Sequence, residues 1–164
     1  MAIPVITIIG KSKSGKTTLM EALIHGIKQH GFRVGTVKHH SHAGFDIDKP
    51  GKDSWRHAHA GSDHVVIAAP DKLASYRTLD KELSLAEVAA GIADVNIILV
   101  EGYKRANMPA IEVVRKERGV ELIGDPDTCL AIATDTPLDT ALPQFDLNDA
   151  PGIVDFVVKG LLSS

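Results

Sequence analysis

Residues 10–17 have a spacing suited to phosphate chemistry: a glycine, four intervening residues, and then Gly-Lys-Thr. An apolar, β-branched run precedes them at 3–9 and an amphipathic helical pattern follows, which is the strand–loop–helix context that a phosphate-binding loop requires. Glycines allow successive backbone N–H groups to converge on an anion, and the N-terminus of a helix adds partial positive charge. We therefore expect this segment to hold a nucleoside triphosphate. The expected phosphate contacts come from Gly10, Lys11, Ser12, Lys13, Ser14, Gly15, Lys16, Thr17 and Thr18.

Some side chains of this segment have more specific expected roles. Lys16 would contact the β- and γ-phosphates, Thr17 would bind Mg²⁺ through its hydroxyl, and Thr18 would meet the α-phosphate. Lys11 has two interpretations. It occupies the position of the signature lysine of the MinD-like ATPases, which acts across a dimer interface. Alternatively, Lys11 and Lys13 only raise the positive potential around the phosphates.

Acidic residues in two places could complete a magnesium site. Glu101 follows the apolar run 97–100, so it should emerge at the carboxyl end of a buried strand, where ligands bind in parallel sheets. Asp46 and Asp48 lie in a polar loop after the second predicted strand, and their spacing places both on one side of an extended segment. We expect Glu101 and Asp48 to join Thr17 at the metal. Glu101, Asp46 and Asp48 are the candidate catalytic acids, and a solvated surface turn is the alternative for the two aspartates.

The histidines permit a second kind of metal site. His39, His40 and His42 form a cluster, and neutral imidazole suits Zn²⁺, Ni²⁺ and Cu²⁺. The accompanying Cys-x-x-Cys or His-x-x-x-His spacing is absent from the sequence, so contacts to a phosphate or a partner are the alternative. Cys129 is the single cysteine and lies in an apolar run, which predicts a buried, unreactive thiol.

The periodicity predicts one α/β domain over residues 1–164. Its fold class is a P-loop NTPase, with a mostly parallel sheet flanked by helices and a short antiparallel hairpin. Strands are expected at 3–9, 32–38, 64–69, 73–79, 96–100, 110–115 and 130–133. Helices are expected at 15–30, 51–61, 84–93 and from about 149 onward. The opening β-α-β pattern implies that the first two strands form a parallel pair.

Composition limits the class of partner. A net charge of −3 and an aromatic content of 4% argue against a nucleic-acid partner. No apolar stretch approaches the roughly 20 residues needed to span a membrane, and the N-terminal apolar run lacks the basic lead of a signal peptide. We expect a cytoplasmic protein.

Several motifs together resemble one family. They are GKSKSGKTT at 10–18, VKHH at 37–40, FDIDKPGKDS at 45–54, VEGYK at 100–104 and FDLND at 145–149. Over nearly the whole chain they are similar to the molybdopterin-guanine dinucleotide biosynthesis protein B (MobB) family. The DxDKPGKDS run is the most specific of them.

This resemblance implies a homodimeric GTP-binding protein with Mg²⁺ and weak GTPase activity. Such a protein would assist the molybdenum cofactor guanylyltransferase, which joins GMP to molybdopterin. The sequence lacks the Asn-Lys-x-Asp motif for guanine, and Asp135 is a possible substitute because a carboxylate accepts hydrogen bonds from guanine N1 and N2. The alternatives are a metal-carrying GTPase chaperone that uses His39, His40 and His42, and a small-molecule P-loop kinase.

Overall fold

The computed structural model describes residues 2–40 and 44–162, which divide into two compact units. Unit 1 comprises Met1–His39 and Ser84–Ser164, and unit 2 comprises His40–Leu83. His42, a member of the predicted histidine cluster, lies outside the described residues.

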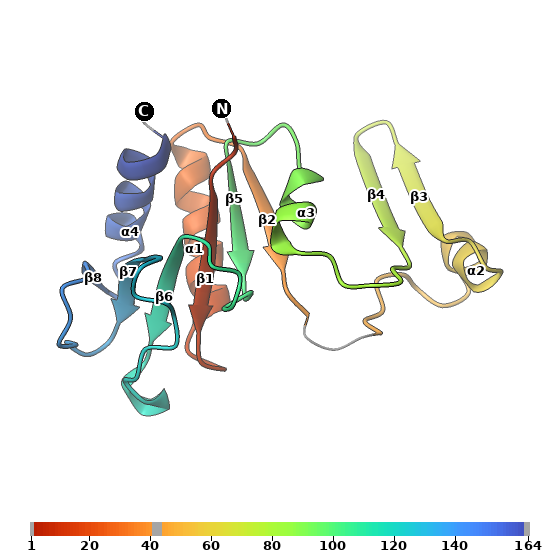
Figure 1. Ribbon diagram of the computed structural model, residues 1–164. Helices are drawn as coiled ribbons and strands as arrows, with labels where there is room; N and C mark the ends of the chain where they lie inside the picture. The colour runs from red at the N-terminus through yellow and green to blue at the C-terminus, as the bar shows by residue number, and fades with distance from the viewer. Residues whose placement is uncertain (1, 41–43, 163–164) are drawn as a thin grey trace. The chain divides into compact units, whose positions relative to one another are not determined.

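Unit 1 is built on a six-stranded sheet in the order β2-β5-β1-β6-β7-β8, and every neighbouring pair is parallel (Figure 1). Parallel strands require crossover connections, which place helices against the faces of the sheet. The predicted α/β architecture with a mostly parallel sheet is confirmed. The strands are β1 (Val5–Gly10), β2 (Val34–Lys38), β5 (Ile97–Glu101), β6 (Ala110–Val114), β7 (Cys129–Thr134) and β8 (Gln144–Asp146).

The predicted direct pairing of the first two strands is wrong. β5 lies between β1 and β2 and pairs with both in parallel register. Burial explains the order. The first four residues of β5 are apolar and buried, which suits a central strand, whereas β2 is only partly buried and lies at the edge. The consequence for function is that Glu101, the last residue of β5, ends a strand adjacent to β1.

The two faces of this sheet are covered differently. Helices α1 (Lys16–Gln29) and α4 (Ala150–Val157) pack on one face. There, Ile6 and Ile8 of β1 pack with the apolar side chains of both helices in the largest core cluster. Because side chains alternate along a strand, Thr7 and Ile9 point to the other face. That face has the short helix α3 (Leu85–Ala90) and long loops as its cover.

The helix boundaries follow local hydrogen bonding. Ser84 and Glu87 form a capping box at the start of α3, and Asp149 caps α4 by accepting from the backbone N–H of Gly152 at 3.0 Å. The strand β8 and the short 3-10 helix η1 (Lys116–Arg118) were not predicted, because they are too short to leave a periodic pattern in the sequence. The π-helical turn η2 (Val158–Leu162) directly follows α4 and lies within the helix predicted from about 149 onward.

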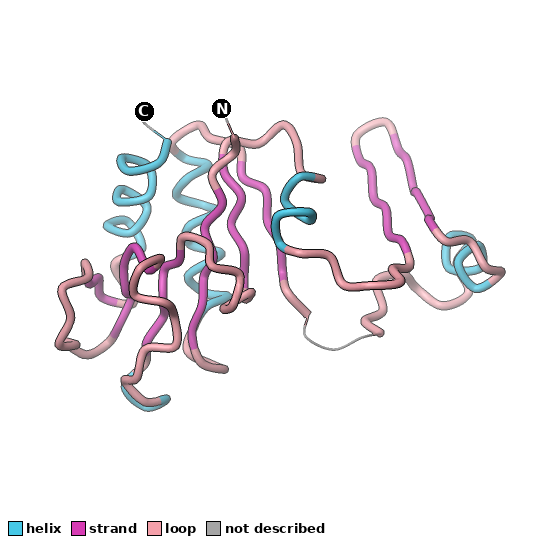
Figure 2. Tube along the Cα trace, in the orientation of Figure 1, coloured by secondary structure: helices cyan, strands magenta, loops and turns pink. Residues whose placement is uncertain are grey.

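Unit 2 contains the helix α2 (Asp53–His59) and the predicted antiparallel hairpin of β3 (His64–Ala69) and β4 (Lys72–Arg77), drawn in Figure 2. Its hairpin carries apolar side chains that face solvent in this chain: Val66 is 53% exposed, Ile67 46% and Leu73 70%. A search of the described residues finds no helix with the length and apolar character of a membrane span.

Candidate functional site

The 10–18 loop has the backbone of an anion cradle. Gly10, Lys13 and Gly15 adopt positive φ angles of 146°, 61° and 106° between the end of β1 and the start of α1. A Cβ atom at Gly10 would lie 2.4 Å from the carbonyl oxygen of Val113, so the backbone of β6 passes too close for any other residue. The loop therefore needs glycine at this position for steric reasons.

Lys16 lies across the loop instead of extending into solvent. Its Nζ donates to the carbonyl oxygens of Gly10 at 3.0 Å and Lys11 at 2.8 Å. Burial lowers the pKa of Lys16, an effect that the nearby Glu101 carboxylate opposes. The ammonium is thus held at the centre of the loop, where an anion bound by the backbone N–H groups would meet it.

Thr17 and Glu101 are brought together by the fold. The Thr17 hydroxyl donates to Oε1 of Glu101 at 3.0 Å, and Nζ of Lys38 lies 3.5 Å from Oε2 of the same carboxylate. A hydroxyl and a carboxylate are hard oxygen ligands of the kind that Mg²⁺ prefers. The side chains present therefore fit a magnesium ion next to the 10–18 loop.

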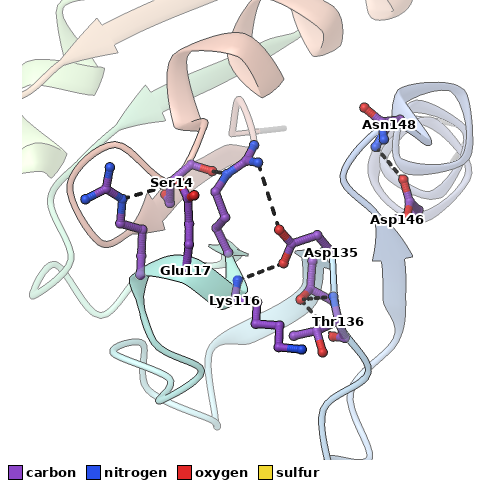
Figure 3. A network of polar contacts seen from close by, with 10 residues as sticks. Ser14, Lys116, Glu117, Asp135, Thr136, Asp146 and Asn148 are labelled. Atoms are coloured by element: carbon purple, nitrogen blue, oxygen red, sulfur yellow. Dashed lines mark hydrogen bonds and ion pairs between the residues drawn. The ribbon is translucent and has the colours of Figure 1, made fainter.

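Arg115 is a residue of this region that the sequence analysis missed. Its Nε donates to the carbonyl oxygen of Ser14 at 3.3 Å, and its Nη1 lies 3.9 Å from Oδ2 of Asp135. Asp135 also accepts from the backbone N–H of Lys116 at 2.7 Å, and Figure 3 shows Ser14, Lys116 and Asp135 around this network. Arg115 thus connects the 10–18 loop to the residue predicted to recognise guanine. Its only signal in the sequence was its place at the end of the predicted strand 110–115.

Lys11 pairs within the chain. Its Nζ contacts the carboxylate of Glu121, and this hydrogen bond holds the pKa of Glu121 below its usual value. A Cβ at Gly119 would lie 2.7 Å from both Lys11 Nζ and Glu121 Oε2, so glycine makes room for the pair. This contact tests neither of the roles predicted for Lys11, which are action across a dimer interface and a positive potential around the phosphates.

Glu112 is a second residue without a sequence prediction. Although it is charged, it is only 1% exposed in the middle of β6. Its two carboxylate oxygens accept from the backbone N–H groups of Ile123 at 2.8 Å and Gly124 at 3.0 Å. A buried carboxylate needs such partners, and here they fasten the loop that contains Glu121 to the sheet.

The hydroxyl of Ser14 is buried and has no hydrogen-bond partner within the described part of the chain. Ser12, Lys13 and Thr18 are exposed, so their polar groups are open to a ligand. The backbone N–H of Ser14 donates to the carbonyl oxygen of Lys11 at 3.3 Å.

Asp46 and Asp48 belong to unit 2. Asp46 is exposed. Asp48 accepts from the hydroxyl of Tyr76 at 2.9 Å and from the backbone N–H of Lys49 at 2.7 Å. A side-chain hydrogen bond from Ser54, together with these contacts, lowers the pKa of Asp48, so its carboxylate stays ionised at neutral pH.

The transition-metal alternative gains no support from the residues 2–40 and 44–162, in which no group of three or more His, Cys, Asp or Glu side chains could hold a metal. His39 stacks on Tyr103 with ring centroids 4.2 Å apart, and His40 meets the edge of Phe45. Cys129 is buried as predicted, and burial followed by the charge of Glu112 raises the pKa of its thiol. A thiol with a raised pKa is a poor nucleophile.

Comparison with known proteins decides the family. A family model described as "Molybdopterin guanine dinucleotide synthesis protein B" matches residues 5–135. The chain belongs to the MobB family. The match includes the 10–18 loop, Glu101 and Arg115, and it ends at Asp135.

Two relatives support this membership over almost their whole length. The molybdopterin-guanine dinucleotide biosynthesis adapter protein of Haemophilus influenzae is 38% identical over 97% of this chain and 90% of its own length. The protein of the same name from Escherichia coli is 35% identical, with 96% and 93% covered. The crystal structure of Bacillus subtilis MobB aligns with a TM-score of 0.77 at 25% identity and covers 98% of this chain and 99% of that one. The family resemblance and the predicted P-loop fold class are confirmed.

Proposed function

We propose that this MobB-family chain binds GTP and Mg²⁺ at the 10–18 loop and acts as an adapter in the attachment of GMP to molybdopterin. The single observation that carries the nucleotide part is the contact of Thr17 with Glu101 beside a loop built for an anion. The names of the Haemophilus influenzae and Escherichia coli relatives support the adapter part.

Different residues of the chain bind the phosphates and the metal in this proposal. The backbone N–H groups of residues 10–16 and the Lys16 ammonium hold the phosphates, because they converge at the N-terminus of α1. Thr17 and Glu101 hold Mg²⁺, which when bound neutralises phosphate charge. Asp46 and Asp48 belong to unit 2, and their predicted roles as catalytic acids stay predictions.

Slow hydrolysis is consistent with an adapter. In phosphoryl transfer the protein mainly positions groups and stabilises charge, and an arginine at the transferring phosphate accounts for much of the rate. Arg115 is near the loop, but it is engaged by the Ser14 carbonyl and the Asp135 carboxylate. We therefore propose weak GTPase activity, with the nucleotide used chiefly for binding.

We further propose that the chain is a homodimer, works in the cytoplasm and has the molybdenum cofactor guanylyltransferase and molybdopterin as partners. The exposed apolar side chains of Val66 and Leu73, which share one face of the β3-β4 hairpin, support self-association, because a partner surface would remove them from water.

Calorimetric titration with GTP and with ATP, each with and without Mg²⁺, tests the binding part. We expect tighter binding of GTP and a clear dependence on Mg²⁺. Formation of the guanine dinucleotide cofactor by the guanylyltransferase, at limiting GTP, tests the adapter part, and we expect more product with this chain than without it. Equal affinity for ATP and GTP together with no gain in product would contradict the proposal.

A further inference from the structure

A cavity lies in unit 1, outside the residues proposed to bind magnesium and phosphate. It has a volume of about 310 Å³, which is within the range of small-molecule sites. Its lining includes Thr7, Ile9, Lys104, Arg105, Met108 and Asp125.

This cavity opens on the sheet face opposite to α1. Ile6 and Ile8 of β1 pack with α1 in the largest core cluster, whereas the alternate residues Thr7 and Ile9 line the cavity. The N-terminus of α1, which begins at Lys16, is on the other side of the strand. The cavity and the 10–18 loop are therefore two separate places on the same unit.

Two cations of the cavity are available to a ligand. Lys104 and Arg105 are exposed neighbours in the loop between β5 and β6. Among the described residues, neither side chain has a hydrogen-bond or ion-pair partner. Two adjacent unpaired cations at the mouth of a cavity favour an anion, and an arginine guanidinium matches the geometry of a phosphate in particular.

The backbone of this loop holds the cations in a fixed, uncommon conformation. Tyr103 and Asn107, which flank them, have φ angles of 54° and 48°. Positive φ at residues other than glycine costs energy and clusters at functional sites. The Tyr103 ring is fixed by stacking on His39, and the backbone N–H of Ala106 closes a turn on the Tyr103 carbonyl at 2.9 Å.

The rest of the lining suits the organic part of such a ligand. Ile9 and Met108 provide apolar surface, while the carboxylate of Asp125 is an acceptor for N–H groups. One Asp125 oxygen accepts from the backbone N–H of Asp127 at 3.0 Å. The second oxygen can accept from an amino group and a ring N–H of a heterocycle.

We propose that this cavity is a second ligand site, for a small 2-amino-4-oxo heterocycle that carries a phosphate monoester. Lys104 and Arg105 hold the phosphate, Ile9 and Met108 contact the ring, and Asp125 accepts from its N–H groups. A pterin monophosphate and GMP share this chemistry. Preference for the pterin rests on the proposed function, whereas the phosphate and N–H contacts do not.

The two sites are joined by one short segment. Glu101, which contacts Thr17, directly precedes the loop that carries Lys104 and Arg105. The N–H of Gly102 donates to the Ile8 carbonyl of β1 at 3.1 Å, so the loop is anchored next to the 10–18 loop. A ligand in the cavity would fix the loop that begins at the proposed magnesium acid.

Titrations with a pterin monophosphate, GMP, unphosphorylated pterin and inorganic phosphate test the proposal. They use the full chain with Lys16→Ala, so that the 10–18 loop lacks the ammonium proposed to bind phosphates. Against this background, Lys104→Ala/Arg105→Ala should weaken binding of the phosphorylated ligands at least about tenfold, because two charge-assisted contacts are lost. The matched variant Lys28→Ala/Arg33→Ala removes two exposed cations elsewhere in unit 1 and should leave the affinity for the phosphorylated ligands unchanged.

A third variant distinguishes recognition of the heterocycle from recognition of the phosphate. Asp125→Asn retains an acceptor for Asp127 and should weaken the phosphorylated heterocycles but not inorganic phosphate. The tighter of pterin monophosphate and GMP identifies the source of the ligand. Equal binding by the parent background and the Lys104/Arg105 variant, or no binding of either phosphorylated heterocycle, would overturn the second site. GTP titration of the unaltered chain is a separate arm, so failure of the proposed nucleotide function is distinguished from failure of this site.

Discussion

The hydroxyl of Thr17 donates a hydrogen bond of 3.0 Å to the carboxylate of Glu101, although 84 positions separate them in the chain. Thr17 is in the first turn of α1 and Glu101 is the last residue of β5. The contact exists because β5 inserts next to β1, so that the end of β5 meets the helix that follows β1. Strand order thus brings together the two side chains that are proposed to hold Mg²⁺.

Replacing Glu101 tests that site. Glu101→Gln should retain GTP binding but lose most hydrolysis and much of the Mg²⁺ dependence, because an amide is a weaker magnesium ligand than a carboxylate. The measurement is a magnesium titration of GTP affinity and turnover. Parent-like turnover with the same titration would show that another acid performs this role, and Asp46 and Asp48 would be the next to replace.

Lys16→Ala should leave the protein folded and weaken GTP binding at least tenfold. Charge-assisted contacts of this kind contribute about 1.5–3 kcal/mol each. The lysine has no apolar packing role, since its Nζ contacts two loop carbonyls. Lys28→Ala, an exposed position near the end of the same helix, is the control for calorimetry. An unchanged GTP affinity in folded Lys16→Ala protein would contradict the assignment.

Asp135→Asn should reduce the preference for GTP over ATP by about 1–3 kcal/mol, because one buried donor or acceptor is left unmatched. Competition binding with both nucleotides measures this. Arg115→Ala is the companion variant, since Arg115 contacts both Asp135 and the Ser14 carbonyl. If Asp135 acts only by positioning Arg115, both variants will lower GTP and ATP affinity equally, and the assignment to guanine would be wrong.

Gly10→Ala should destabilise the chain and abolish nucleotide binding, because the new methyl group would lie 2.4 Å from the Val113 carbonyl oxygen at a φ of 146°. A strain of this kind costs on the order of 1–3 kcal/mol. Gly160→Ala is the matched control, since no atom lies within 4 Å of the added carbon. Thermal unfolding compares the two, and equal stability would show that the loop is free to relax.

Acid titration should report on Asp48. Its folded-state pKa is depressed below the ordinary value of 3.8, so its stabilising contribution is present above that value and lost as the pH falls through the lowered one. Trp55 is the single tryptophan and lies beside Ser54, which bonds Asp48, so its fluorescence follows unit 2.

We expect Asp48→Asn to remove an acid transition in this fluorescence. Trp55 also stacks on His59, and the variant His59→Gln identifies any fluorescence change that arises from the imidazole. An identical acid transition in Asp48→Asn would show that the Asp48 contacts do not stabilise this unit.

Sequence alone determined the local parts of this protein. The glycine and lysine spacing of residues 10–17, the stripe of α1, the capping box at Ser84 and the hairpin around 70–71 all depend on contacts between near neighbours in the chain. The motifs also carried the family resemblance, which the match to residues 5–135 confirms.

The tertiary structure decided which distant residues meet. The insertion of β5 between β1 and β2, the contact of Thr17 with Glu101 and the link from Arg115 to Asp135 depend on strand order. Strand order is set by how much apolar surface each strand buries on both faces, and periodicity within a segment does not contain that information. The sequence around Glu112 also did not predict its partners. Its carboxylate accepts from the backbone N–H groups of Ile123 and Gly124, in the loop that follows β6, and a contact between a strand and a loop is not visible in periodicity.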